Sequence, residues 1–490
     1  MTRRWLFGDQ LGPHFTQDLG SGDEAVLVVS RRVFARRRYH RAKAHLLLTA
    51  MHHRAAELGV RLHVVDRYAD VLDEVAPDEV IEPTSKPART FVRSLGLRIL
   101  PSRGFITDHD EFRAWATGRR RLLLEDWYRQ VRSTRGILME DGSPIGGRWN
   151  FDQDNRLPPP RAATSLGLPR PWQPQEGDTD SQVRTLLDDW ERDGYVAWIG
   201  EDGPRMFAAT RSEALAVLDD FVEHRLAEFG PYEDATMAGD WAMAHSLLSP
   251  AMNLGLIHPM EVVQRCVDAF HANAAPLPSV EAITRQILGW REYVWQLYWW
   301  PDEQSTDEAP NALGAHEPIP AWFADLESEE VQAACLSGSL HEVRVRGWSH
   351  HIVRLMILGN WALQRGYQPQ QVSDWFTRAF VDGYPWVMTA NVIGMSQYAD
   401  GGRMATKPYA AGGAYIKRMT NYCGSCTYRP DVRVGPNACP FAAGYWAFLN
   451  RHRELLKSNH RMAQPLRGLD RLADLEELLV QEERRGASAP

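Results

Sequence analysis

The segment Trp5-Leu6-Phe7-Gly8-Asp9-Gln10 is a short apolar run that ends in a polar loop. Four similar runs follow within the first 100 residues, and a long helical pattern, from about His40 to Leu58, separates the second run from the third. Alternation of this kind is typical of βαβ units, in which helices cover a parallel sheet. We therefore predict an α/β domain over residues 1–130, with strands at residues 5–7, 25–29, 62–65, 80–81 and 97–100.

The polar loop after the first run is a candidate ligand loop. Parallel sheets bind ligands at the carboxyl ends of their strands, and Gly8, Asp9 and Gln10 directly follow such an end. The loop lacks the G-x-G-x-x-G pattern, which argues against a dinucleotide site of the usual kind. Asp9 and Gln10 are therefore candidate contacts of another cofactor.

The composition is that of a folded, soluble protein. The chain has 490 residues, a formal charge of −8, 44% hydrophobic residues and 24% charged residues, which excludes wholesale disorder. No stretch approaches 18 consecutive apolar residues, so we expect no membrane span, and Asp9 comes too early for a secretory signal. Mild acidity argues against non-specific coating of nucleic acid. We expect a cytoplasmic monomer.

The rest of the chain changes pattern twice. Residues 131–185 are rich in proline and predict a long connector, although its stretch Gly146-Gly147-Arg148-Trp149-Asn150-Phe151-Asp152 is too distinctive for a passive linker. Residues 186–483 carry helical patterns, the first opened by the capping-box pair Thr210 and Glu213. We predict a large all-α domain there, with helices at residues 280–298, 349–364 and 371–380 among others, and a frayed tail at 484–490.

Tryptophan is unusually frequent. The 18 tryptophans outnumber the 16 phenylalanines and the 15 tyrosines. Large aromatic residues dominate core packing, so most of these indoles should pack in the interior. A few could instead stack on a ligand or carry electrons.

Three cysteines have the spacing of metal ligands. Cys423 and Cys426 form a C-x-x-C pair that can reach one metal centre from a tight turn, and Cys439 follows within a short loop. Tetrahedral zinc and cubane iron–sulfur centres both take four ligands. The frequency of C-x-x-C zinc sites in cytosolic proteins favours zinc, and scattered buried thiols are the alternative.

The spacing of the cysteines alone does not identify the fourth metal ligand. Cys335 is a better candidate than Cys266, because Cys266 lies in an amphipathic helical pattern and is expected to be a small buried residue. His452 would give a mixed set of ligands.

Five segments of the helical half resemble, in order, motifs of the photolyase/cryptochrome family. They correspond to the family's TS-x-LSP loop, its R-x-L-x-WRE[FY] helix, its GW-x-HN-x-x-R segment, its DG…ANN-x-G flavin segment and a following Lys-Pro-Tyr step. Each motif is weak alone, but five in order are specific. They read here as His245-Ser246-Leu247-Leu248-Ser249-Pro250, Trp290-Arg291-Glu292-Tyr293, Gly347-Trp348-Ser349-His350-His351, Asp382-Gly383 with Ala390-Asn391, and Lys407-Pro408-Tyr409.

With the cysteine pattern and the His350-His351 pair, the chain resembles the iron–sulfur bacterial branch of that family, the prokaryotic (6-4) photolyases and related deoxyribodipyrimidine photolyase-related proteins. The resemblance implies a Rossmann-like antenna domain followed by an all-α FAD-binding domain. It implies a U-shaped FAD, a [4Fe-4S] cluster instead of zinc, and a 6,7-dimethyl-8-ribityllumazine antenna near Asp9 and Gln10. The implied cluster ligands are Cys335, Cys423, Cys426 and Cys439, and the implied FAD contacts are Ser246, Leu248, Ser249, Trp290, Arg291, Arg354, Asp382 and Asn391.

The implied reaction is light-driven repair of UV-damaged DNA. Photoexcited reduced FAD is expected to pass an electron to a flipped-out pyrimidine dimer, and the expected dimer is a (6-4) photoproduct. The resemblance assigns acid/base work to His350 or His351, the lesion side of the pocket to Tyr409, and first electron donation to Trp375. Two alternatives are a blue-light photoreceptor on the same scaffold, with little or no repair, and a zinc-stabilised nucleic-acid-binding protein.

Two features depart from the family's pattern. Ser30-Arg31-Arg32 stands where an acidic residue is expected after the second strand, which puts the lumazine pocket in question. A distal indole expected between Trp322 and Cys335 has no match, so the electron path beyond Trp375 is open.

Overall fold

The N-terminal part of the chain is built on one sheet of five parallel strands. A computed structural model describes residues 1–300 and 309–490. The strand order is β3-β2-β1-β4-β5, and every neighbouring pair is parallel. These strands confirm the five that the sequence predicts: β1 (Arg3–Leu6), β2 (Glu24–Ser30), β3 (Leu62–Val65), β4 (Glu79–Ile81) and β5 (Arg98–Leu100).

The loop after β1 lies where the strand order reverses, which is the expected ligand crevice of such a sheet. The Gln10 side chain bridges the ends of β1 and β4, because Nε2 donates to the carbonyls of Ile81 (3.1 Å) and Glu82 (3.3 Å) while Oε1 accepts from the Phe7 N–H (3.2 Å). The Thr84 hydroxyl donates to the Asp9 carboxylate. In this structure both predicted loop residues therefore tie strand ends together.

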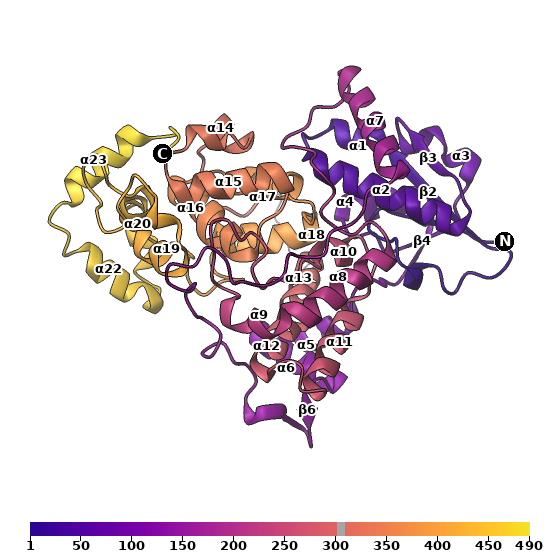
Figure 1. Ribbon diagram of the computed structural model, residues 1–490, viewed down its shortest axis with the longest axis horizontal. Helices are drawn as coiled ribbons and strands as arrows, with labels where there is room; N and C mark the ends of the chain where they lie inside the picture. The colour runs from indigo at the N-terminus through magenta and orange to yellow at the C-terminus, as the bar shows by residue number, and fades with distance from the viewer. Residues whose placement is uncertain (301–308) are drawn as a thin grey trace.

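Helices cover the sheet and make up most of the rest of the chain (Figure 1). The helices before the connector are α1 (Arg31–Ala35), α2 (Arg41–Leu58), α3 (Leu72–Val75), α4 (Lys86–Ser94), α5 (His109–Ala116) and α6 (Leu124–Arg135). The connector carries a small hairpin of β6 (Met139–Glu140) and β7 (Ser143–Pro144).

The second half is helical, in agreement with the predicted fold class. Its α-helices are α7 (Asp178–Arg192), α8 (Arg211–His224), α9 (Leu226–Tyr232), α10 (Ser249–Asn253), α11 (Pro259–His271), α12 (Leu277–Thr284), α13 (Glu292–Trp299), α14 (Ala321–Ala324), α15 (Ala334–Arg346), α16 (Asn360–Arg365), α17 (Pro369–Ala379), α18 (Pro385–Met388), α19 (Gly413–Met419), α20 (Pro440–Arg451), α21 (Arg453–Leu456), α22 (Ala463–Leu469) and α23 (Leu475–Arg485). Three π-helical segments join them: η4 (Arg285–Arg291), η6 (Val353–Gly359) and η7 (Thr389–Ser396).

Helix packing crosses both predicted domain limits, at residues 130 and 185. Helices α5 and α6 precede the connector but both pack against α13, and α6 also packs against η4. Helix α7 begins at Asp178, before the predicted end of the connector, and packs on α2. The two parts of the chain therefore share helices across the connector.

The predicted helix start at Thr210 is confirmed. The Glu213 N–H donates to Thr210 Oγ1 (3.2 Å), and the Thr210 N–H donates to the Glu213 carboxylate (3.3 Å), which is a capping box. The apolar pattern, however, continues past a break at Arg225, where the backbone leaves helical geometry before α9. Periodicity alone does not show this break.

The last residues do not fray as their composition suggests. The Trp322 indole donates to the Ala487 carbonyl (2.8 Å), and the Ala333 N–H donates to the Pro490 carbonyl (3.0 Å). These contacts dock the tail at the start of α15, which carries Cys335.

Most of the tryptophans that the structure describes are buried in the interior, as expected. The largest fully buried side chains include Trp5, Trp127, Trp295, Trp361, Trp375 and Trp386. Within residues 1–300 and 309–490, no helix has both the length and the apolar character needed to cross a membrane.

Glu292, at the start of α13, anchors a loop of the N-terminal half. One of its carboxylate oxygens accepts hydrogen bonds from the Ile106 N–H (3.0 Å), the Thr107 N–H (2.9 Å) and the Thr107 hydroxyl (2.9 Å). The side chain is fully buried, and burial raises the pKa of Glu292 to about 7. This buried carboxyl is one of the contacts that join the two halves of the chain.

We predict that Glu292→Ala lowers the free energy of unfolding by about 1–3 kcal/mol, because buried donors lose their acceptor. A carboxyl whose folded pKa lies above its unfolded value binds more protons in the folded state, so its contribution to stability falls as pH rises from about 4.5 to about 7. Glu292→Gln should therefore flatten the decline of the thermal midpoint over this range. Equal pH dependence in wild type and Glu292→Gln would contradict this assignment.

Candidate functional site

Three of the five motif segments lie on π-helical turns, which are rare and often occur at functional sites. Segment η4 ends at Arg291, η6 contains Arg354 and η7 contains Asn391. Segments η6 and η7 pack closely at Gly359, where a Cβ atom would come within 2.2 Å of Ser396 Oγ. The motif segments are thus wide helical turns gathered in the interior of the helical half.

The centre of this region is a buried ion pair between Arg354 and Asp382. Arg354 Nη1 and Nη2 donate to the two carboxylate oxygens at 2.9 and 3.0 Å, a bidentate arrangement. Ser249 Oγ donates to the same carboxylate (2.6 Å), and Asn253 Nδ2 donates to the Asp382 carbonyl (2.9 Å). Since Asp382 is only 5% exposed, these partners compensate its charge.

The ion pair extends to the second predicted arginine. Arg291 Nη1 donates to Asn253 Oδ1 (2.5 Å), so Asn253 links Arg291 to the Asp382 loop. The Arg291 guanidinium also lies over the rings of Phe105 (4.9 Å) and Trp386 (4.8 Å), and burial lowers the pKa of Arg291 to about 10. Trp290 packs at the edge of the same aromatic cluster. The structure thus brings the predicted Ser249, Arg291, Arg354 and Asp382 into one network, through an asparagine that the motifs did not single out.

The three predicted residues of the phosphate-binding loop have different surroundings in this structure. The Ser249 hydroxyl is bonded to Asp382, and Leu248 is fully buried in the main core. Ser246 lines a small pocket with His245 and Arg225.

Trp375 lies close to the ion pair. Its indole is fully buried, and its ring centroid is 5.9 Å from that of Phe380, over which the Arg354 guanidinium lies at 4.2 Å. On its other side it contacts Phe323 (4.7 Å), which in turn contacts Trp322 (5.7 Å). A chain of aromatic rings therefore leads from the ion pair toward the docked tail.

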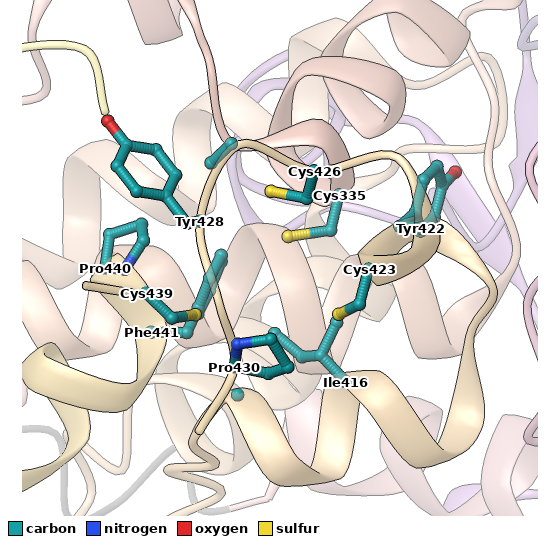
Figure 2. Close-up of a pocket in the computed structure, with 12 residues that line it drawn as sticks. Cys335, Ile416, Tyr422, Cys423, Cys426, Tyr428, Pro430, Cys439, Pro440 and Phe441 are labelled. Atoms are coloured by element: carbon teal, nitrogen blue, oxygen red, sulfur yellow. The ribbon is translucent and has the colours of Figure 1, made fainter. Parts of the chain in front are cut away.

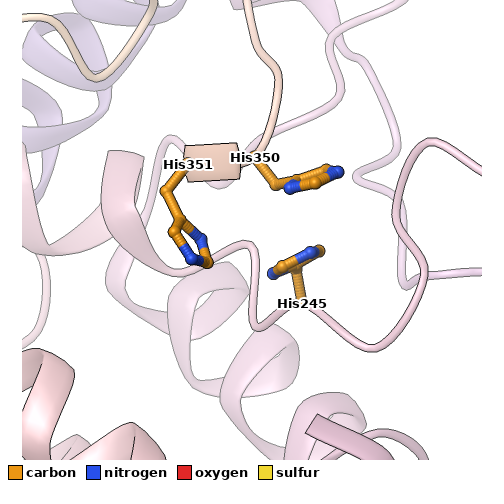
Figure 3. A group of neighbouring side chains, drawn as sticks. All are labelled: His245, His350 and His351. Carbon is orange, nitrogen blue, oxygen red and sulfur yellow. The ribbon is translucent and has the colours of Figure 1, made fainter. Parts of the chain in front are cut away.

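The two histidines of the motif differ in environment, and a third joins them (Figure 3). His350 is 5% exposed and its ring stacks on His245, with centroids 4.3 Å apart and planes 17° apart. Burial and the neighbouring His245 and His351 hold the pKa of His350 well below its ordinary value. Its Nε2 lies 3.0 Å from the Thr236 hydroxyl. His350 is therefore a neutral imidazole near neutral pH.

His351 is the exposed member of the pair and has an acidic partner. Its Nε2 lies 3.6 Å from the Asp234 carboxylate. Although burial alone would raise it, the pKa of Asp234 is lowered, because His351 and Arg156 stabilise the carboxylate. Tyr409 packs against the same side, near Ile352 and Met356. Nothing in the sequence pattern marks Asp234, whereas His245 stands directly before the Ser246 motif.

The ligand nitrogens of His245, His350 and His351 lie within 4.8 Å of one another. Stacked imidazoles, however, direct their lone pairs along parallel lines, whereas ligands of one metal ion must direct them to a point. This arrangement suits the holding and movement of protons better than metal binding.

The four predicted metal-ligand cysteines surround one pocket (Figure 2). Cys335 comes from the first turn of α15, Cys423 and Cys426 from the turn after α19, and Cys439 caps α20. In the part of the chain that the structure describes, neither Cys266 nor His452 lines this pocket, and Cys266 is buried in α11. The choice of Cys335 as the fourth member thus agrees with the geometry.

The surroundings of the cysteines fit a metal centre. A Cβ atom at Gly413 would come within 3.0 Å of Cys439 Sγ and 2.8 Å of the Pro430 carbonyl, so a glycine keeps this wall open. Burial and the neighbouring sulfurs raise the pKa of the Cys335 thiol well above its ordinary value and that of Cys423 to about 11. Thiolates crowded in this way repel one another, and a cationic metal centre would offset that repulsion.

Comparisons with known proteins agree with this geometry. Residues 4–195 match the family described as Deoxyribodipyrimidine photo-lyase-related protein. The chain is 37% identical over 486 residues, 94% of each chain, to a (6-4) photolyase of Agrobacterium fabrum (strain C58 / ATCC 33970). In fold it is similar to a bacterial class III photolyase from Agrobacterium tumefaciens (TM-score 0.57, 16% identity, 99% of this chain and 96% of that one). It is also similar to a cryptochrome of Synechocystis sp. PCC6803 (TM-score 0.56, 12% identity, 99% and 98%). On this sequence identity and coverage, the chain belongs to the photolyase/cryptochrome family.

Proposed function

We propose that this protein is a light-driven DNA repair enzyme that acts on pyrimidine dimers of the (6-4) type. The observation that carries the proposal is the half-exposed His351–Asp234 pair, one helical turn from the Arg354–Asp382 pair. The relative that is 37% identical over 94% of the chain is named a (6-4) photolyase, which supports the same lesion.

The buried ion-pair network is the proposed site of FAD. When bound, reduced FAD excited by light supplies an electron to the lesion and takes it back after the bond has broken. Arg354 and Asp382 would hold the flavin ring region, Asn391 would lie near it on η7, and Ser246 and Ser249 would contact the phosphates. The donors of this network, two arginines, an asparagine and the Ser249 hydroxyl, suit an anionic, hydrogen-bonding cofactor, and Ser249 would turn from Asp382 to reach a phosphate.

The proposed acid is His351. Reversal of a (6-4) adduct moves an oxygen-bearing group back to its original base, and a proton donor assists that transfer. Asp234 would favour a proton on the facing Nε2 of His351, and Nδ1 would then exchange a proton with the lesion. His350, neutral and bonded to Thr236, would orient its neighbour, and Tyr409 would close the lesion side of the pocket.

The proposed partner is UV-damaged DNA, with the lesion turned out of the duplex into this pocket. A damaged base has already lost pairing and stacking, so its extrusion costs less than that of an intact base. We further propose an iron–sulfur cluster at the four cysteines and a ribityl lumazine antenna at the crevice beside Asp9. The Asp9–Thr84 contact would have to open for that antenna to enter.

The alternative function is a blue-light photoreceptor with little or no repair. The fold is compatible with both functions, because the TM-scores to a cryptochrome (0.56) and to a photolyase (0.57) are nearly equal. The two functions differ in whether lesions are reversed.

We predict that His351→Asn lowers light-dependent repair of a (6-4) oligonucleotide by about 100-fold or more, the usual contribution of a general acid, while bound FAD is unchanged. His316→Asn, at an exposed histidine, is the matched control and should repair normally. Repair should be measured by chromatography of the restored oligonucleotide. Normal repair by His351→Asn would overturn the assignment of the acid.

We predict that Cys335→Ala removes the iron of the purified protein and its broad visible absorption, because a cubane cluster needs all four thiolates. Cys266→Ala, the buried cysteine of α11, should keep both. Metal analysis and absorption spectra make the comparison. Iron content unchanged in Cys335→Ala, or zinc in place of iron in wild type, would contradict the proposed cluster.

We predict that Trp375→Phe slows light-driven reduction of bound oxidised FAD in the presence of a thiol reductant, because the indole that contacts Arg354 through Phe380 is lost from the aromatic chain. Trp5→Phe, which alters an equally buried indole in the sheet, should leave the rate unchanged. Flavin absorption under continuous blue light follows the rate. Equal rates in wild type and Trp375→Phe would exclude Trp375 as the first donor.

A further inference from the structure

The first turn of α2, in the α/β part, is inserted into the helical part. His40 Nε2 lies 2.8 Å from the carbonyl oxygen of Val343 and 3.0 Å from that of Arg344, in the last turn of α15. Lys43 Nζ donates to the carbonyls of Thr377 (2.7 Å) and Phe380 (3.1 Å), and also to that of Gly383. His40 is fully buried and Lys43 is 8% exposed. Lys43 is therefore bonded to the other half of the chain, and the His40 ring joins that half through Nε2 while its Nδ1 accepts from the Ala42 N–H and caps α2.

The segments that α2 contacts carry the central ion pair. Helix α15 ends at Arg346 and its C-cap Gly347 leads into the segment of Arg354, while α17 leads into the loop of Asp382. The two loops are joined to each other, since the Val381 N–H donates to the Gly347 carbonyl (2.8 Å). Gly347 has a φ of +60°, and a Cβ there would come within 3.2 Å of the His40 ring. The point where the two loops meet therefore packs directly against His40 at the start of α2.

Lys43 suits the end of α17 electrostatically. The last carbonyls of a helix carry partial negative charge and lack partners within the helix, so a cation placed there stabilises them. Burial lowers the pKa of Lys43 to about 7, and the nearby Asp382 carboxylate opposes that shift. The rings of Tyr384 (5.1 Å) and Tyr39 (5.7 Å) flank the ammonium. A buried ammonium with three carbonyl acceptors fixes those carbonyls in one arrangement.

We propose that Lys43 and His40 are positioning residues of the flavin site, which hold the Asp382 loop in register with Arg354 from the α/β half of the chain. The proposal rests on the proposed FAD site. It makes α2 part of the flavin-binding structure as well as a cover of the sheet. Removal of Lys43 frees the Phe380 and Gly383 carbonyls and loosens the loop on which Asp382 lies.

The test is hydrogen–deuterium exchange and flavin retention of the full-length holoprotein carrying Lys43→Met. Loss of the bonds to a charged donor should raise exchange of the Val381 and Gly383 amides about tenfold or more. Flavin should be released faster, while the iron content is unchanged. Lys457→Met, at an exposed lysine paired only with Glu454 in the described contacts, is the matched control and should change neither. Exchange at residues 377–384 and flavin release both equal to wild type would overturn the proposal.

If Lys43→Met does not fold, the variant His40→Ala tests the proposal instead, because it leaves Lys43 in place and removes the side-chain contacts to α15. Raised exchange confined to residues 343–349 and 380–384 supports the proposal, and unchanged exchange there overturns it. The exchange measurement needs neither light nor a lesion. If the variants show raised hydrogen exchange but the wild-type protein repairs no lesion, only the proposed function is contradicted.

Discussion

The bidentate ion pair between Arg354 and Asp382 is the contact on which the rest of the site depends. Two charges taken out of water stabilise a fold only when each is fully compensated, and here Ser249 and Asn253 supply the remaining bonds of Asp382. Those bonds bring together α10, η6 and the loop before α18, which are far apart in the sequence. The pair therefore fixes how the motif segments meet.

Other buried polar contacts join the two halves of the chain closely. Lys43 and His40 reach into the helical part below the two loops, and Glu292 reaches back to the loop at Ile106 and Thr107. These contacts run in opposite directions across the same boundary. An antenna in the α/β half and a flavin in the helical half would then be held at a fixed separation by buried polar contacts.

Much of the fold could be predicted from the sequence, because strand runs and helix caps are local signals. The five strands and the helix start at Thr210 agree with the structure, and the pocket lined by the three motif cysteines is also lined by Cys335 and not by Cys266. Contacts between distant segments could not be predicted in this way. The π-helical turns, the break at Arg225 and the docking of Pro490 depend on tertiary partners that no local pattern encodes. Asp234 was missed for the same reason, since only the fold places it beside His351.

The proposed activity combines a flavin site, a histidine acid and an aromatic electron path. Its most direct test is product analysis of a defined (6-4) oligonucleotide after incubation with the reduced holoprotein in blue light and in darkness. If the proposed repair activity is correct, the two original thymines are restored in light alone. A holoprotein that carries fully reduced FAD and restores none would contradict it.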